Sequence, residues 1–295
     1  MIRVAVAIFC LTLISGCASD DSDAMAGKLL KGSGVKTFDG MPGKRMRVFY
    51  HRPVSFEPDG LVLIALHGVG RNAEGTRDSW RNLSGLHGFL LIAPEFSKDN
   101  FPGGRRYARG NMRLKSGALN PAEEWSFNAV EKLFDEVRGW SGGTRGKYLL
   151  FGHSAEGQFV HRMITFMPNS RIERAVAANA GWYAMPDENE DFPYGLKGAD
   201  IADAQLSTAF AHNLTVMLGD ADANPDSKNL NRGAGAMKQG EHRLARGLNY
   251  FDAVKLKASK MDVPFAWRLE IVPGAGHSTN DVKAAAVLVL LQIQR

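Results

Sequence analysis

Short apolar runs of strand length recur along the chain and constrain its fold more than any other feature. They are "MRVFY" at 46–50, "LVLIAL" at 61–66, "FLLIAPEF" at 89–96, "KYLLFG" at 147–152, "RAVAANAG" at 174–181, "LTVMLGD" at 214–220 and "FAWRLEIVPG" at 265–274. Their near-continuous apolar character is typical of strands that are buried on both faces of a mainly parallel sheet. Such strands require covering layers on both sides of the sheet.

Helical patterns lie between these runs. Asn120, Pro121 and Glu123 form a helix start, with a capping residue, a proline at the first helical position and a glutamate three residues after the cap. A second helix is expected directly after Ser154. The apolar stretch 281–294 indicates a last helix that is too short to cross a membrane. Alternating strands and helices predict a doubly wound α/β fold, and we assign residues 36–295 to one domain.

The N-terminus has the organisation of a secretory signal peptide over residues 1–16. A short basic start precedes an apolar run at 4–14 and then small residues. "LISGC" resembles the lipobox of bacterial lipoproteins, which implies a lipidated Cys17 and a membrane anchor; a cleaved signal without lipid is the alternative. Residues 17–35 are then expected to form a flexible tether. By the same resemblance Ser19 favours the outer membrane for the lipidated protein, and a periplasmic or secreted location is the alternative.

Cysteine usage and charge exclude several classes of protein. Both cysteines, Cys10 and Cys17, lie in the N-terminal segment, so the mature chain is expected to contain no disulfide and no cysteine nucleophile. The formal net charge of +5 is spread along the chain without a nucleic-acid-binding module, and we expect no nucleic-acid partner. A calcium-like pattern at 220–231 fails because Pro225 and Asn231 replace the required glycine and glutamate. We therefore expect no metal and no cofactor.

The stretch 183–212 mixes acidic residues, aromatic residues and turn signals, and it lies between two expected strands. We interpret it as a lid or cap insertion after the sixth strand, because long loops in compact domains usually serve a function. A surface excursion without a function is the alternative. The aromatic side chains of Trp182, Tyr183, Phe192 and Tyr194 are weak candidates for a substrate pocket.

Ser154 is the candidate nucleophile. It lies in "FGHSAEGQFVH" at 151–161, directly after an apolar strand and directly before an amphipathic helix. This strand–turn–helix context is what a nucleophile elbow of the Gly-x-Ser-x-Gly type requires. Glu156 stands where the second glycine is usual, and Gly157 follows. In the first helical turn a glutamate suits the helix dipole and avoids burial if it points outward, so we expect it to be tolerated and Ser154 to be active.

A serine hydroxyl needs a base, and the base needs an orienting acid. His277 follows the last expected strand in a Gly-rich loop and is the candidate base. Asp220, Asp222 and Asp226 follow the preceding strand and are candidate acids. The turn after 61–66 contains His67, Gly68 and Gly70, and the backbone amides of Val69 and Ala155 are candidate oxyanion donors.

The motifs "ALHGVGRNAEG", "GHSAEGQFVHR" and "GAGHS" resemble the α/β-hydrolase superfamily, near its esterases and polyhydroxybutyrate-depolymerase-like members. The resemblance covers roughly residues 45 to 295. It implies the α/β-hydrolase fold with a Ser154–Asp222–His277 triad, because the acid in this superfamily often comes three residues after a strand-ending glycine, here Gly219. Asp220 is the alternative acid.

The resulting hypothesis is a serine hydrolase that cleaves small or polymeric carboxylic esters through an acyl-enzyme on Ser154. A polyester depolymerase or a peptidase-type amide hydrolase with the same triad is the first alternative. The second is an inactive lipoprotein that retains the fold as a binding scaffold, motivated by Glu156. The sequence leaves the oligomeric state open.

Overall fold

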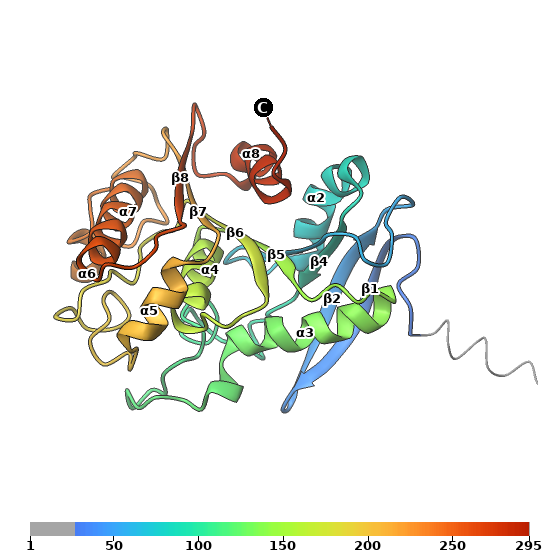
Figure 1. Ribbon diagram of the computed structural model, residues 1–295, viewed down its shortest axis with the longest axis horizontal. Coiled ribbons are helices and arrows are strands. Elements are labelled where there is room, and N and C mark those ends of the chain that lie inside the picture. The colour runs from blue at the N-terminus through green and yellow to red at the C-terminus, as the bar shows by residue number, and fades with distance from the viewer. Residues whose placement is uncertain (1–26, 295) are drawn as a thin grey trace, which may run out of the picture.

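A single eight-stranded sheet organises the chain in the order β1-β2-β4-β3-β5-β6-β7-β8 (Figure 1). The computed structural model describes residues 27–294. The strands are β1 (Gly32–Met41), β2 (Lys44–Arg52), β3 (Val62–Ala65), β4 (Leu90–Pro94), β5 (Tyr148–His153), β6 (Ile172–Ala178), β7 (Leu214–Gly219) and β8 (Arg268–Val272). β2 pairs antiparallel with β1 and β4, whereas the pairings from β4 through to β8 are parallel. The mainly parallel sheet expected from the apolar runs is thereby confirmed.

Helices cover both faces of this sheet. They are α2 (Ala73–His87), α3 (Ser126–Ser141), α4 (Ala155–Phe166), α5 (Asp203–Phe210), α6 (Ala234–Met237), α7 (Arg243–Lys260) and α8 (Thr279–Leu291). α2 and α8 pack on one face and on each other, and α3, α4 and α7 pack on the other face (Figure 1). Among residues 27–294, no helix is long and apolar enough to cross a membrane.

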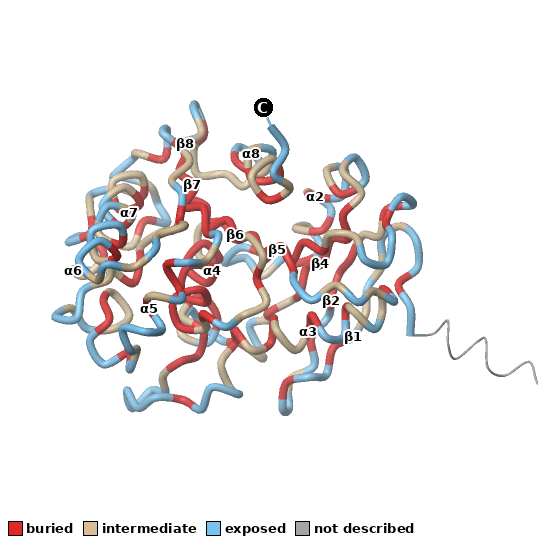
Figure 2. Tube along the Cα trace, in the orientation of Figure 1, coloured by how far each residue is buried: buried red, intermediate tan, exposed pale blue. Residues whose placement is uncertain are grey.

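Alternate residues of the central strands belong to two different apolar clusters. Ile64 and Leu150 face the cluster under α3 and α4, whereas Leu63 and Leu149 face the cluster under α2 and α8. Side chains of a strand point alternately to its two faces, so both sets must be apolar. This explains the uninterrupted apolar runs, and the buried course of β5, β6 and β7 is visible in Figure 2.

The predicted start of the helix before β5 is wrong. Pro121 precedes a short 3₁₀ turn (Ala122–Glu124), and α3 begins only at Ser126. Trp125 has an extended backbone and separates the 3₁₀ turn from α3. Its indole Nε1 donates to Asn120 O at 2.7 Å. The N–H of Ser126 also donates to Gly110 O at 2.8 Å, and this tertiary hydrogen bond and the burial of Ser126 outweigh the local capping signal.

The predicted tether over residues 17–35 is too long. β1 begins at Gly32 and pairs with β2, and Leu29 is buried with its N–H bonded to Trp140 O at 3.0 Å. The Gly-Ser composition of this stretch is typical of a linker, but its backbone completes the edge of the sheet. The predicted signal peptide, Cys17 and the first part of the tether lie outside the described residues.

The stretch 183–212 does lie between β6 and β7, and it ends in α5. Its first part is irregular and is held to α4 by His161, whose Nε2 accepts from Ala184 N at 3.1 Å. Tyr183 is buried and stacks on Tyr250 with ring centroids 4.3 Å apart. Tyr183 therefore packs in the core and does not line a pocket.

The carboxyl ends of the parallel strands carry the residues that the sequence singles out. The turn at 67–70 follows β3, Ser154 follows β5, Asp222 comes shortly after β7, and His277 follows β8. Parallel strands end at one edge of a sheet, which is where sites collect in open α/β folds. The topology therefore gathers segments that are far apart in the sequence.

Close packing of α4 on the sheet yields a first prediction. A Cβ added to Gly157 would lie 2.6 Å from Ala178 O, whereas one added to Gly85 in α2 would meet nothing within 4 Å. Gly157→Ala should lower the free energy of unfolding by about 2 kcal/mol through overpacking. Gly85→Ala should raise it by up to about 1 kcal/mol through helix propensity. Urea denaturation of the two variants measures this, and equal effects would contradict the packing argument.

Candidate active site

Ser154 lies on a strained turn between β5 and α4. Its backbone angles are φ 62° and ψ −116°, in a region that residues with a side chain rarely adopt and that costs on the order of 1–3 kcal/mol. The turn is tight, because a Cβ added to Gly152 would lie 2.3 Å from Glu156 O. Such a turn presents the serine hydroxyl at the carboxyl edge of the sheet.

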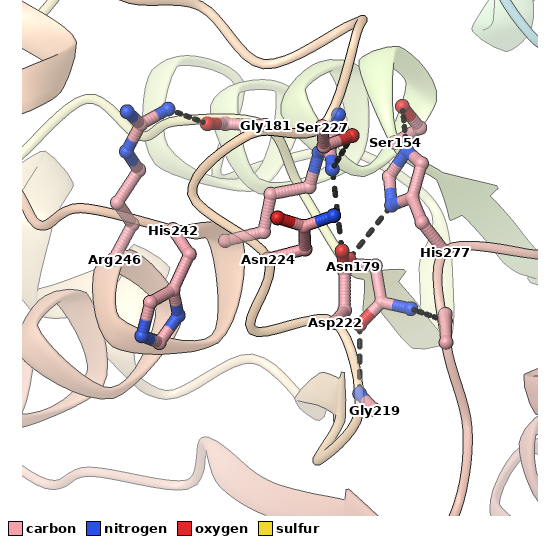
Figure 3. Close-up of polar contacts among 12 residues, drawn as sticks. Ser154, Asn179, Gly181, Gly219, Asp222, Asn224, Ser227, His242, Arg246 and His277 are labelled. Carbon is pink, nitrogen blue, oxygen red and sulfur yellow. Dashed lines mark hydrogen bonds and ion pairs between the residues drawn. The ribbon is translucent and has the colours of Figure 1, made fainter.

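A continuous series of hydrogen bonds joins Ser154, His277 and Asp222 (Figure 3). The distance from His277 Nε2 to Ser154 Oγ is 3.0 Å, and that from His277 Nδ1 to Asp222 Oδ2 is 2.7 Å. A carboxylate only accepts hydrogen bonds, so the imidazole proton lies on Nδ1 and Nε2 can accept the serine proton. The structure thus brings together three residues from the ends of three strands.

Arg243 completes the surroundings of Asp222. Its Nη1 lies 3.2 Å from Asp222 Oδ1, and the side chains of Arg243 and Asp222 are only 2% and 4% exposed. The same Nη1 donates to Ser227 Oγ at 3.1 Å. A buried carboxylate needs such a partner, because an isolated buried charge is costly. The sequence analysis missed Arg243, since no motif marks it at the start of α7.

Asn179 connects the loops that follow β7 and β8. Its side-chain Oδ1 accepts from Gly219 N at 2.8 Å, and its Nδ2 donates to Gly276 O at 3.1 Å (Figure 3). Asn179 is buried and has a left-handed φ of 42°. It therefore sets the separation between the Asp222 loop and His277. The position of Asn179 directly after an apolar strand marks it as a turn residue, but nothing local in the sequence indicates its two distant partners.

The other two aspartates of the loop point elsewhere. Asp220 Oδ1 accepts from Gly274 N at 2.7 Å and supports the turn after β8. Asp226 is 91% exposed and pairs with Arg232 at 3.4 Å. Of the three candidate acids, the structure places Asp222 against His277.

Val69 and Ala155 line one cavity of about 300 Å³. Ala155 is the first residue of α4, so its N–H has no acceptor within the helix. Arg71, Lys98 and Tyr107 line the same cavity. The two candidate oxyanion donors thus come from different strand ends and share one space next to the nucleophile.

His67 stabilises the turn that contains Val69 through hydrogen bonds. His67 Nε2 accepts from Phe96 N at 2.9 Å, so its proton lies on Nδ1, which donates to Gly68 O at 3.1 Å. Tyr107 Oη donates to His67 O at 2.9 Å. Burial lowers the pKa of His67 to about 4, which keeps the imidazole neutral at pH 7.

Arg71 anchors the end of the same turn. Its guanidinium donates to the carbonyl oxygens of Phe96, Phe101 and Gly103 at 2.6, 3.0 and 3.2 Å, and it lies 4.0 Å from the centre of the Tyr107 ring. These contacts hold the segment 96–103 against the turn.

His153 packs directly behind the candidate base. Its ring lies 4.8 Å from the ring of His277, and it is 8% exposed. Burial, reinforced by the neighbouring His277, lowers the pKa of His153 to about 3, so this imidazole adds no positive charge beside the base.

Glu156 does not point outward as the sequence suggested it could. Its side chain is 1% exposed and is directed toward Gly68, where an added Cβ would lie 3.8 Å from Oε2. Gly157, the next residue, is the one that touches β6. The close approach of helix and sheet therefore falls one residue later than the usual motif places it, which leaves space for the glutamate.

The other predicted features divide between packing and surface. Trp182 packs on Tyr194 with ring centroids 4.5 Å apart, and Arg162 lies 4.4 Å from the centre of the Trp182 ring. Phe192 packs on Phe166 at 5.7 Å. Within residues 27–294, no group of three or more histidine, cysteine, aspartate or glutamate side chains could hold a metal ion.

Two solved structures resemble the chain over nearly its whole length. Poly(aspartic acid) hydrolase-1 from Sphingomonas sp. KT-1 has a TM-score of 0.87 and 39% identity, over 89% of this chain and 100% of its own. A poly(3-hydroxybutyrate) depolymerase from Bordetella parapertussis has a TM-score of 0.85 and 30% identity, over 90% of this chain and 91% of its own.

An S-formylglutathione hydrolase from Staphylococcus aureus shares the fold alone, with a TM-score of 0.54 and 15% identity over 88% of this chain and 98% of its own. No protein-family model and no curated protein matches the chain.

Proposed function

The chain belongs to the α/β-hydrolase family of the Sphingomonas and Bordetella enzymes, and on this premise we propose that it is a serine hydrolase that cleaves carboxylic esters through an acyl-enzyme on Ser154. Its fold is the α/β-hydrolase fold, and hydrolysis is the activity that the relatives have in common. The observation that carries the proposal is the hydrogen-bonded series from Ser154 through His277 to Asp222.

The proposed acyl transfer follows from the positions of Ser154, His277 and the two candidate donor amides. His277 Nε2 takes the proton of Ser154 Oγ while that oxygen bonds to the ester carbonyl carbon. The carbonyl oxygen becomes negatively charged, and the N–H groups of Val69 and Ala155 stabilise it. The intermediate then expels the alcohol, which takes the proton from His277. A water molecule then gives its proton to His277 and attacks the acyl-enzyme in the same way, and Ser154 Oγ takes the proton back as the carboxylic acid is released.

Asp222 serves this cycle as a fixed negative charge. It holds the Nδ1 proton in place and stabilises the imidazolium that forms during each step. Arg243 keeps the buried carboxylate oriented through its second oxygen. These contacts argue against an inactive scaffold. A protein that only binds a partner does not need a buried, oriented acid against a histidine that in turn contacts a strained serine.

A second candidate activity is the hydrolysis of amide bonds in a carboxylate-bearing polymer. The cavity that Val69 and Ala155 share is lined by two cations, Arg71 and Lys98, and by no acidic side chain. This charge distribution suits an anionic substrate and agrees with the name of the relative at 39% identity. A polyester, as in the Bordetella relative, is the uncharged counterpart.

We propose further that the protein is exported and anchored in the cell envelope through Cys17, at the outer membrane. The basic start, the apolar run and "LISGC" in residues 1–17 support this. Mass spectrometry of the mature N-terminus should find Cys17 as the first residue with covalent lipid, and a Cys17→Ser variant should stay unlipidated. A mature wild-type protein that begins at another residue would contradict the anchor.

Labelling and turnover test the triad. A fluorophosphonate probe should label the wild type at Ser154, and Ser154→Ala should abolish labelling. Asp222→Asn should lower kcat for a short p-nitrophenyl ester by about 10³- to 10⁴-fold, because the imidazole loses its orienting charge. Asp220→Asn is the matched control and should lower kcat by less than about tenfold, since Asp220 only supports a turn. Equal losses in the two variants would reject Asp222 as the acid.

Charge reversal at the cavity separates neutral from anionic substrates. Lys98→Glu should raise KM for poly(aspartic acid) by about tenfold or more and leave p-nitrophenyl acetate within about twofold, because only the polymer is repelled. Lys255→Glu is the control, since Lys255 is exposed on α7 and does not line the cavity. If the wild type and Lys98→Glu both cleave the ester but neither cleaves poly(aspartic acid), the proposed hydrolysis of an anionic polymer is rejected.

A further inference from the structure

Glu156 is a buried acid that the proposed mechanism does not use. Its side chain is 1% exposed, and both carboxyl oxygens are buried without a hydrogen-bond partner among the described residues. Leaving such a group unpaired is costly, so its retention at this place calls for a physical reason.

The side chain connects the two halves of the proposed oxyanion hole. Glu156 follows Ala155 directly at the start of α4, and its carboxyl group reaches Gly68, which directly precedes Val69. It also lines a cavity of about 380 Å³ behind the turn, together with Gly68, Gly70 and His153. The side chain of Glu156 therefore lies beside Gly68, while its backbone directly follows that of Ala155.

The groups that face Glu156 favour its uncharged form. Arg71, from the turn after β3, is occupied by three backbone carbonyls, and Tyr107 lies across its guanidinium. His153, from β5, is neutral because burial lowers its pKa to about 3. Burial raises the pKa of Glu156 well above its usual value, and the N–H of its own backbone and the charge of Arg71 only partly oppose this.

The residues of α2 and α8 around the cavity are uncharged. They are Gly75, Thr76 and Ser79 from α2, with its cap Asn72, and Thr279 and Asn280 from α8, with its cap Ser278. The cation nearest to this lining in the sequence of α8 is Lys283, which does not itself line the cavity and whose ammonium donates to Ser79 O at 2.9 Å and to Asn280 Oδ1 at 2.6 Å.

We propose that Glu156 is a positioning residue of the oxyanion hole, beside which it is held as an uncharged carboxylic acid, and that its ionisation weakens acyl transfer. The inference rests on the proposed function. An uncharged acid places no negative charge behind the donors. An ionised one opposes the charge that develops on the substrate oxygen, and it does so in the transition state and not in the bound ester. The effect should therefore fall on kcat and leave KM nearly unchanged.

The pH profile of kcat tests the proposal. We expect the wild type, assayed with a short p-nitrophenyl ester from about pH 6 to about pH 10, to lose about tenfold or more in kcat through one alkaline ionisation. Glu156→Gln retains the size of the uncharged acid but cannot ionise. Its kcat at pH 7 should lie within about threefold of the wild type, and its alkaline loss should disappear.

Glu74→Gln is the matched control. Glu74 occupies the same position in the first turn of α2, two residues after the cap, but its side chain is 59% exposed. This variant should keep the wild-type profile. An alkaline loss of the same size in the wild type and in Glu156→Gln would overturn the proposal, as would an effect on KM alone.

A second measurement needs no variant. Infrared spectroscopy of the wild type should show a protonated carboxyl band at pH 7 that disappears over the same pH range as kcat. A band that is absent at pH 7 would overturn the proposal even if Glu156→Gln fails to fold.

Fluorophosphonate labelling distinguishes a failure of the proposed role of Glu156 from a failure of the proposed function. Labelled protein with an unaltered profile in Glu156→Gln contradicts only the role of Glu156, whereas protein that neither labels nor turns over ester contradicts the proposed function as well.

Discussion

The close contact of α4 with β5 and β6 is the constraint on which the site depends. Gly152 and Gly157 allow the helix backbone to approach the strands to distances that no Cβ would permit. This contact forces Ser154 into its left-handed conformation. The strain at one residue is sustained because the helix and the strands on either side of it are buried and well packed. Every other element of the site is placed relative to this turn.

Charge within the site is balanced locally. Asp222 is buried, and both of its oxygens are used, one by His277 and one by Arg243. The histidines nearest to this pair and to the oxyanion turn, His153 and His67, are kept neutral by burial. A low-dielectric site with one oriented carboxylate and few competing charges strengthens each remaining electrostatic interaction. The same condition acts on Glu156, which is buried beside the turn at 67–70 and whose pKa is raised by that burial.

Sequence reasoning succeeded where a residue stands directly beside an element with a strong pattern. Ser154 and His277 follow apolar strands, and the structure places both at the carboxyl edge of the sheet. It failed where the partner is distant or the local pattern is weak. Arg243 is 21 residues from Asp222, and Asn179 is 97 residues from Gly276, so no local signal connects them. β1 was missed because its composition is typical of a linker and its stability comes from pairing with β2.

The sequence by itself determined the class of fold and singled out Ser154 and His277 as the candidate nucleophile and base. Apolar periodicity and a Gly-rich turn are local properties that a single chain displays in full. Only the tertiary structure placed Asp222 and not Asp220 against His277, directed Glu156 inward and placed the close packing at Gly157. Each of these outcomes depends on distances of a few ångströms between segments that are remote in sequence. Such distances are set by how helices and strands pack, and no local pattern encodes them.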